Sequence, residues 1–204
     1  FTPIYAPNRR GKTSPNTQKV YHLKGIKYND YWGYQDGVKR NSRIKEIEEP
    51  ILMLNHYWDI SSKTTINTNV GYQFGSIGNS RLDYGGGANP SPTYYQKLPS
   101  YFISDPDGPD NAGAYLAEQE FLNNGQIDWN RIYDANLTNN ASGTTAAYAL
   151  YEDRNDDKQL TVNSILNSEI NKHIQLNAAV NYKSLKSENF AEIKEIIKFK
   201  KGFE

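Results

Sequence analysis

Residues 66–75 read INTNVGYQFG, and their side chains alternate in character along the whole stretch. The uncharged, mostly apolar row consists of Ile66, Thr68, Val70, Tyr72 and Phe74, and the row between them of Asn67, Asn69, Gly71 and Gln73. A β-strand points successive side chains to opposite faces. The stretch therefore predicts a strand with one apolar face and one polar face, and the fold depends on which solvent meets each.

Three further segments alternate in the same way, at residues 52–60, 160–170 and 174–184. Their apolar rows are Leu52, Leu54, His56, Trp58 and Ile60, then Leu160, Val162, Ser164, Leu166, Ser168 and Ile170, then Ile174, Leu176, Ala178, Val180, Tyr182 and Ser184. Each segment has about the 9 to 11 residues that a tilted membrane strand requires.

Charge separates the two rows of these segments. The apolar rows contain no Asp, Glu, Lys or Arg and one histidine, His56, whereas Asp59, Glu169 and Lys183 occur in the opposite rows. A Lys or Arg that faces lipid at the bilayer midplane costs about 2–4 kcal/mol. The pattern therefore favours lipid on the apolar side and a wet lumen on the other. Tyr57 and Trp58 suit an interfacial aromatic girdle.

The connections are of two kinds. Residues 61–64 and 171–173 predict tight hairpin turns. The stretches 1–50 and 76–159 are far longer than the roughly 4 to 6 residues that usually connect elements in compact domains. Short turns at one end and long loops at the other are typical of outer-membrane barrels.

The fold class that we predict is mainly β, part of an antiparallel transmembrane β-barrel with two hairpins and long extracellular loops that contain short helices. Its parts are an extracellular loop and strand extension (1–50), a transmembrane hairpin (51–75), a long extracellular loop (76–159), a second transmembrane hairpin (160–190) and a tail (191–204). The alternative is a β-sandwich, whose solvent faces usually carry more charge and whose turns recur at roughly 8–12 residues.

Local signals predict further elements in the long stretches. Residues 43–49 suit an extended strand. Residues 112–123 suit a helix capped by Asp110 or Asn111 and ended by Gly125, and residues 129–137 a helix capped by Asp128. Residues 139–145 predict an exposed loop. The tail 191–204 leaves three alternatives open: an amphipathic helix, the end of a strand, or an artificial extension.

Composition excludes several function classes. Lys plus Arg and Asp plus Glu both number 23, so the chain has no net charge, which argues against a nucleic-acid partner. Cysteine is absent, which excludes disulfides and thiolate metal sites. The sequence has no Walker loop, GxGxxG, HExxH or GxSxG motif, and we expect no enzymatic activity.

Aromatic residues in the two long stretches are the candidate ligand-binding residues. They are Trp32 and Tyr34 in the first stretch and Tyr94, Tyr95, Tyr101 and Phe102 in the second. Aromatic rings stack on sugars or apolar ligand groups and present a large area at low entropic cost. The alternative is that these rings pack the loops against each other.

One acidic stretch is a candidate metal site. Asp153, Asn155 and Asp157 begin like a calcium loop, D-x-N-x-D, with Asp156 beside them. However, Lys158 stands where such a loop has glycine, and Ser164 where it has glutamate. The alternative is a salt-bridged loop base in which Arg154 and Lys158 neutralise the acids. Apart from calcium, we expect no cofactor.

Four phrases of the sequence resemble the barrel portion of a TonB-dependent receptor of the large outer-membrane nutrient-receptor branch with a carboxypeptidase-regulatory-like domain. They are LNHYWDISSKTTINTNVGYQFG, ANPSPTYYQKLPSYF, YEDRNDDKQLTVNSIL and NYKSLKSENFAEI, and the likeness covers roughly residues 15–193. In that family a barrel of about 22 strands encloses a plug. The sequence shows neither plug nor TonB box, so we expect an internal fragment.

The resemblance implies a function and a location. It implies import of a nutrient ligand (glycan, peptide or siderophore) across the outer membrane of a Gram-negative bacterium. The implied partners are outer-membrane lipid, the missing plug and remaining barrel strands, the TonB complex that supplies energy, and a surface lipoprotein. The alternative function is that of a secreted β-rich glycan-binding module that uses the same tyrosines.

Overall fold

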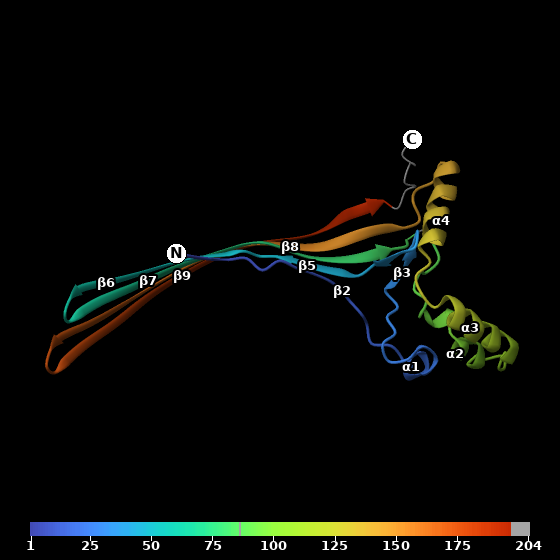
Figure 1. Cartoon of the computed structure of the whole chain (residues 1–204), viewed down its shortest axis with the longest axis horizontal. Helices are drawn as coiled ribbons and strands as arrows, with labels where there is room; N and C mark the ends of the chain where they lie inside the picture. The colour runs from blue at the N-terminus through green and yellow to red at the C-terminus, as the bar shows by residue number, and fades with distance from the viewer. Residues whose placement is uncertain (86, 197–204) are drawn as a thin grey trace. The chain divides into compact units, whose positions relative to one another are not determined.

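The computed structural model describes residues 1–85 and 87–196 (Figure 1). Strands account for 49% and helices for 22% of it, so the fold is mainly β, with antiparallel sheets, as predicted. The chain forms two compact units. We name Phe1–Arg9, Lys45–Asn79 and Asp153–Ala191 the sheet unit, and Arg10–Ile44, Ser80–Glu152 and residues 192–196 the helical unit.

One antiparallel sheet contains most of the strands. They are β1 (Thr2–Ile4), β2 (Asn8–Gly11), β5 (Ile44–Glu48), β6 (Ile51–Ser61), β7 (Thr64–Asp83), β8 (Ala149–Asn171) and β9 (Ile174–Ile196). β7 pairs with β6, β5 and β8, and β9 pairs with β8. β1 and β2 lie along β6 and β5. The expected extended strand at 43–49 is β5.

β5 and β6 continue each other along one edge of β7. Lys45 pairs with Asn79 and Ile51 pairs with Gln73 in the same offset, so the two short strands share one register. Pro50 interrupts them because it has no N–H to donate to the ladder. Its carbonyl still accepts a hydrogen bond from Phe74 N, at 3.2 Å.

Both predicted hairpin turns are confirmed. In the first, Ser61 pairs with Thr64 and the register shifts by one residue between Asp59 and Ser61. In the second, β8 ends at Asn171 and β9 begins at Ile174, and Asn171 Oδ1 accepts from His173 N at 2.9 Å. These short turns are the tight ends of the two hairpins in Figure 1.

The strands are longer than predicted, which corrects the boundaries of the long loop. β7 has 20 residues, and β8 and β9 have 23 each. Residues 76–83 and 149–159, expected in a loop, are therefore strand, and the connection runs from 84 to 148. The charges of β8 suggested a loop, but on a strand they pair with one another, as Arg154 does with Asp156.

The helical unit contains α1 (Gln18–Lys24), β3 (Trp32–Gln35), β4 (Val38–Asn41), the 3₁₀ turn η1 (Tyr95–Lys97), α2 (Pro99–Ile103), α3 (Asn111–Asn124) and α4 (Trp129–Ala141). β3 and β4 form a hairpin that the sequence analysis missed. Its loop, Asp36 and Gly37, has φ angles of 50° and 77°, as a type I′ turn requires. Among the described residues, no helix has the length and apolar character needed to cross a membrane.

Both predicted helix caps are confirmed. Asp110 Oδ1 accepts from Gly113 N at 2.8 Å, and Asp128 Oδ1 accepts from Arg131 N at 2.9 Å. These bonds satisfy backbone donors that lack a partner in the first helical turn. α4 extends to Ala141, so the exposed loop expected at 139–145 begins only after that residue. In the tail, β9 continues to Ile196, and residues 197–204 lie outside the described part.

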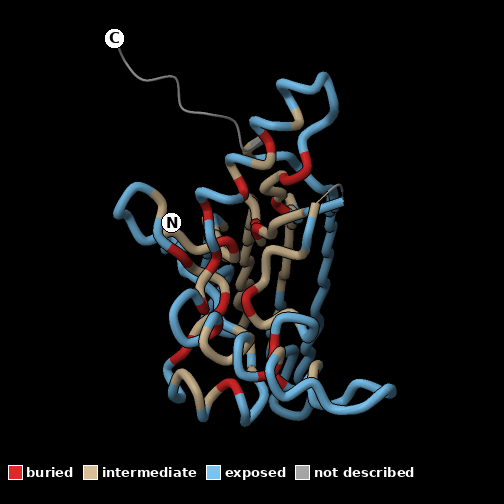
Figure 2. The backbone as a smooth tube through the Cα atoms, turned by 90° about the vertical axis from the view of Figure 1, so that its right-hand side faces the viewer, coloured by how far each residue is buried: buried red, intermediate tan, exposed pale blue. Residues whose placement is uncertain are grey.

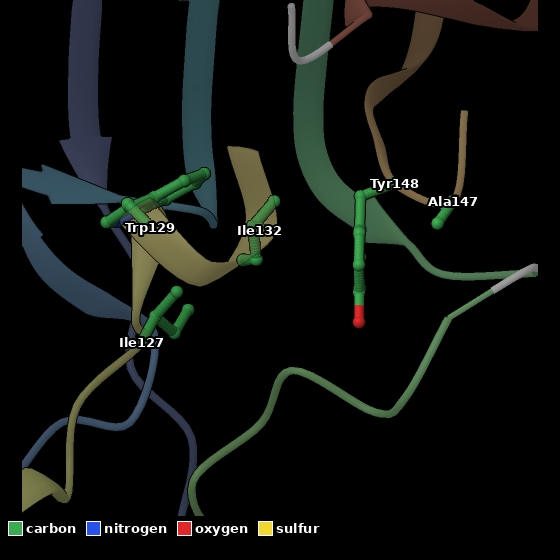
Figure 3. Close-up of a cluster of buried hydrophobic side chains, with 5 residues drawn as sticks. All are labelled: Ile127, Trp129, Ile132, Ala147 and Tyr148. Carbon is green, nitrogen blue, oxygen red and sulfur yellow. The ribbon is translucent and has the colours of Figure 1, made fainter. Parts of the chain in front are cut away.

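The buried side chains of the helical unit form two clusters, and the buried positions are red in Figure 2. Ile127, Trp129, Ile132, Ala147 and Tyr148 form the first (Figure 3), and Val20, Tyr28, Leu98 and Phe121 form the second. Asn136 joins α4 to the segment before β8. Its Nδ2 donates to Tyr148 O at 2.8 Å and its Oδ1 accepts from Tyr148 N at 2.9 Å.

Candidate functional site

The structure brings four of the predicted ligand-binding residues together in a chain of ring contacts. The centroids of Tyr94 and Tyr95 lie 4.9 Å apart, those of Tyr95 and Tyr101 5.7 Å, and those of Tyr101 and Phe102 5.4 Å, all edge to face. η1 and α2 position them, and Pro99, which suits the first turn of a helix, begins α2. Tyr95 and Tyr101 also line a hollow of about 300 Å³.

Trp32 and Tyr34 form a separate edge-to-face pair on β3. Their ring centroids are 5.4 Å apart. Lys39, the cross-strand partner of Tyr34, holds its Nζ 3.9 Å from the centroid of the Trp32 ring, a cation–π contact. The hairpin therefore presents an aromatic pair with one face of Trp32 covered.

A cleft of about 920 Å³ in the helical unit links the two predicted aromatic groups, because Tyr34 and Phe102 both line it. α3, the start of α4 and the segment 88–97 supply most of its lining, and Tyr148 also lines it. The cleft lies against the first buried cluster, which contributes Ile127, Ile132 and Tyr148 to it. Its size is within the usual range of small-molecule sites, about 300–1,000 Å³.

Burial and positive charge perturb the titratable groups of the cleft. Desolvation, followed by repulsion from Arg131, lowers the pKa of Lys97. Desolvation raises the pKa of Tyr148, although Arg131 and the bond to Ala88 oppose the shift. The Tyr148 hydroxyl donates to Ala88 O at 2.7 Å. Perturbed titratable groups in a cleft make it a candidate binding site.

Sequence reasoning missed Lys97, Arg131 and Tyr148 as cleft residues. Lys97 lies inside the aromatic run YYQKLPSYF, and Arg131 follows the predicted cap Asp128 by three residues. The aromatic run could therefore have pointed to Lys97, and the helix cap could have pointed to Arg131. No local pattern marks Tyr148, which reaches the cleft only through its packing with α4.

The candidate calcium residues lie on a strand instead of in a loop. Asp153, Asn155 and Asp157 are all in β8, where alternate side chains are about 7 Å apart along one face. The backbone therefore does not wrap them around an ion, and the described residues contain no group of three or more His, Cys, Asp or Glu placed to hold a metal. The acids are partly salt-bridged: Arg154 contacts Asp156 at 3.0 Å.

In the sheet unit, the apolar rows of the four long strands share one face. The register of β6 and β7 sets Leu54 opposite Val70 and Trp58 opposite Ile66. Thr68 Oγ1 lies 3.0 Å from Ser164 Oγ, and Thr64 Oγ1 lies 2.8 Å from Ser168 Oγ, which brings the β8 row to the same side.

The β9 row joins this face as well. The guanidinium of Arg154 lies 5.6 Å from the centroid of the Phe190 ring, so the even-numbered residues of β8 and β9 point the same way. We name the even-numbered residues of 52–60, 64–74, 160–170 and 174–184 the apolar band. Large side chains in it are exposed, among them Leu54 at 51% and Val180 at 71%.

The apolar band ends at one level on adjacent strands. When the register of Thr68 with Ser164 is continued, Lys158 lies beside Phe74 and Asp156 beside Ser76. Beyond that level the same face is charged, and its members are Glu46, Glu48, Arg154, Asp156, Lys158, Lys186 and Glu188. Three ion pairs form there: Arg9 with Glu46, Arg154 with Asp156, and Lys186 with Glu188.

The length of the band and its aromatic ends are consistent with a lipid-facing surface. From residue 64 to residue 74 the strand advances about 33 Å at the usual rise. A barrel tilt of about 40° would reduce this to a height of roughly 25 Å, that of an outer-membrane apolar belt. Trp58 lies toward the turns, and the Tyr72 and Phe74 rings stack 5.3 Å apart at the charged limit.

Comparisons with protein-family models, with curated proteins and with solved structures found no match for this chain.

Proposed function

We propose that the chain is part of a TonB-dependent outer-membrane receptor that imports a nutrient ligand, with the sheet unit as a portion of its transmembrane barrel. The observation that supports this proposal is the apolar band. It covers four adjacent strands of a single-layer sheet and contains no Asp, Glu, Lys or Arg, with His56 as its one histidine. Beyond its end the same face of the sheet is charged.

The absence of a second layer in the sheet unit favours lipid as the solvent of the band. Gly78 is the one buried residue in this unit, all of which is described. A β-sandwich would bury such a face against another sheet at about 10 Å. Hydrocarbon lipid covers the same surface without any protein layer.

The opposite face of the sheet suits a wet lumen. Across β6 and β7 its pairs include Asn55 with Asn69 and Tyr57 with Asn67. Near the turns, Lys63 Nζ lies 3.6 Å from Glu169 Oε1 on this side. Polar amides and paired charges are stable in water but not in hydrocarbon, which sets the two faces apart.

In this proposal the helical unit belongs to the extracellular loops, and its aromatic residues contact the ligand. They are Trp32, Tyr34, Tyr94, Tyr95, Tyr101 and Phe102. The plug, the remaining strands, the TonB complex and a surface lipoprotein would be the protein partners. The sheet is open at β9, whose outer edge has no described strand paired to it, and unpaired edges associate with other strands.

A secreted glycan-binding module remains the alternative function. The chain of ring contacts from Tyr94 to Phe102 favours it, because such rings stack on sugars in any protein. A module of this kind would be a soluble monomer with a cooperative thermal transition. A barrel portion would need detergent or lipid.

An arginine substitution at mid-band tests the proposal. Val70 lies at the middle of the β7 row, so Val70→Arg would place a cation at the bilayer midplane. The variant should be less stable than the wild type in phospholipid vesicles by about 2–4 kcal/mol. Urea titration of the full chain in the vesicles measures the difference. Asn69→Arg is the matched control, because it adds the same charge at the same depth on the lumen side.

The control should change the folding free energy by under about 1 kcal/mol, since water solvates the lumen face. Equal costs for the two substitutions would remove the support for lipid contact. Recovery of the wild-type chain as a soluble monomer without detergent would favour the secreted module.

A further inference from the structure

Lys97 and Arg131 both line the cleft of the helical unit, and neither forms an ion pair with a carboxylate of the described residues. Lys97 Nζ donates to the carbonyls of Asn89 at 2.6 Å and Ser91 at 3.1 Å, which leaves one of its three donors unused. Within the described ranges 1–85 and 87–196, Arg131 donates from its backbone N to Asp128 Oδ1, and its guanidinium makes no ion pair or hydrogen bond. Repulsion between the two contributes to the lowered pKa of Lys97.

The carboxylates of the cleft are already engaged. Asp128 caps α4 by accepting from Arg131 N, and Glu120 Oε1 accepts from Asn124 Nδ2 at 3.1 Å. A third cation, Lys24, also lines the cleft. The cleft is lined by three cations, Lys24, Lys97 and Arg131, and by two carboxylates, Glu120 and Asp128, so positive charge is in excess. The partly enclosed walls strengthen its field.

The rest of the lining is apolar or ring-bearing. Phe102, Leu116 and Ile132 supply apolar surface, and Tyr34 supplies a ring with a hydroxyl. Gln126 also lines the cleft, and its buried Oε1 accepts no hydrogen bond from the part of the chain that the structure describes. An acceptor without a donor costs free energy that a ligand hydroxyl or amide would recover.

We infer that this cleft binds an organic anion, a carboxylate or phosphate carried on an apolar or sugar-like body, with Arg131 and Lys97 holding the anionic group. The planar guanidinium offers two parallel donors to either oxyanion, and the ammonium adds a point charge. The bound anion would also separate the two like charges. This site goes beyond nutrient import in general and does not depend on which solvent covers the apolar band.

Titration with small probes tests the site. The full chain in detergent micelles is titrated with benzoate, phenyl phosphate and the neutral analogue benzyl alcohol, and the backbone amides of Gly125 and Ile127 are followed by NMR. Benzoate or phenyl phosphate should shift both amides with a Kd on the order of 1 mM, and benzyl alcohol should bind more weakly. The better of the two anions identifies the oxyanion as a carboxylate or a phosphate.

Arg131→Gln should weaken the binding of both anions about tenfold or more, as loss of a charge-assisted hydrogen-bonded pair requires. It should not change benzyl alcohol binding. Arg10→Gln, outside the cleft, is the matched control and should bind like the wild type. Arg131→Lys should give an intermediate affinity because it keeps the charge and loses the fork.

Two results would overturn the site: no anion-dependent shift in the wild-type chain, or equal anion affinity in wild type and Arg131→Gln. If Arg131→Gln loses its helical circular dichroism, Lys97→Gln against Lys27→Gln gives the same comparison. None of these results bears on the Val70→Arg test, so failure of the cleft and failure of the barrel proposal are distinguishable.

Discussion

The two units of this chain treat their hydrophobic side chains in opposite ways. Every described hydrophobic residue that is buried lies in the helical unit, where Trp129 is 0% exposed. In the sheet unit no large apolar side chain is buried, and several are exposed, including Trp58 at 53%. The helical unit therefore carries its own core, whereas no described residue covers the apolar face of the sheet unit.

This difference shows that alternation alone does not identify the solvent of a strand. The proposal of lipid contact adds two observations to alternation: apolar rows from four strands coincide on one face, and charge begins at one level on neighbouring strands. A bilayer would impose such a common height.

The largest effect that separates the units is expected from a tryptophan truncation. Trp129→Ala should lower the free energy of unfolding of the helical unit by about 3–5 kcal/mol, because it leaves a cavity in the first buried cluster. Urea unfolding followed by circular dichroism at the helical band measures this. Trp58→Ala is the matched control, and a loss of the same size there would mean that the sheet unit also has a protein core.

A smaller effect is expected at the end of β9. Arg40 Nη2 lies 2.6 Å from Glu195 Oε2, and Tyr133 donates to Glu195 Oε1 at 2.9 Å. Arg40→Ala should cost about 1–2 kcal/mol because it breaks a partly buried network. Lys19→Ala, which removes an exposed pair with Glu118, should cost about 0–0.5 kcal/mol. Equal costs would mean that the network adds nothing beyond an ordinary surface pair.

High pH should weaken the helical unit. Desolvation, followed by the charge of Asp30, raises the pKa of Tyr28, whose hydroxyl donates to Gly125 O at 2.7 Å. The folded state therefore favours the protonated phenol of Tyr28. The stabilisation that this phenol contributes is fully present below its pKa of 10.0 in the unfolded chain, and it is lost as pH rises through the higher pKa of the folded state.

Tyr28→Phe should cost about 0.5–1.5 kcal/mol at neutral pH and reduce the loss of stability at alkaline pH. Denaturant titrations at a series of pH values measure both. An unchanged alkaline loss in the variant would assign it to other groups.

The smallest effect is expected from calcium. The extended geometry of β8 holds Asp153, Asn155 and Asp157 apart, so calcium at about 1 mM, enough for weak extracellular modules, should leave thermal stability unchanged. Calorimetric titration of the chain and of Asp157→Asn makes the comparison. Saturable binding that Asp157→Asn abolishes would restore the calcium-site interpretation.

The hairpin turns and the helix caps were predictable from the sequence, but the full lengths of the strands were not. The turn at Ser62 and Lys63 and the caps Asp110 and Asp128 depend on local chemistry, which a sequence displays directly. The charged half of β8 looked like a loop because its pairing partners lie on the same or neighbouring strands. The β3–β4 hairpin was missed although Asp36–Gly37 is a strong local turn signal.

The candidate site was predictable only in part, for a similar reason. The chain of rings from Tyr94 to Phe102 follows from residues that are close in sequence. The cleft itself depends on packing between α3, α4 and Tyr148, which no local pattern encodes. Its cations, Lys97 and Arg131, come together only through that packing.

The accessibility of spin labels along β7 and β8 tests most directly whether lipid covers the apolar band. The chain has no cysteine, so single cysteines at 68–73 and at 158 can carry nitroxide labels in the vesicle-bound native polypeptide. Accessibility to oxygen should be high at the even positions of 68–73, and accessibility to an aqueous nickel complex should be high at the odd positions and at 158. Equal values at even and odd positions, or an even row shielded from both reagents, would contradict lipid contact.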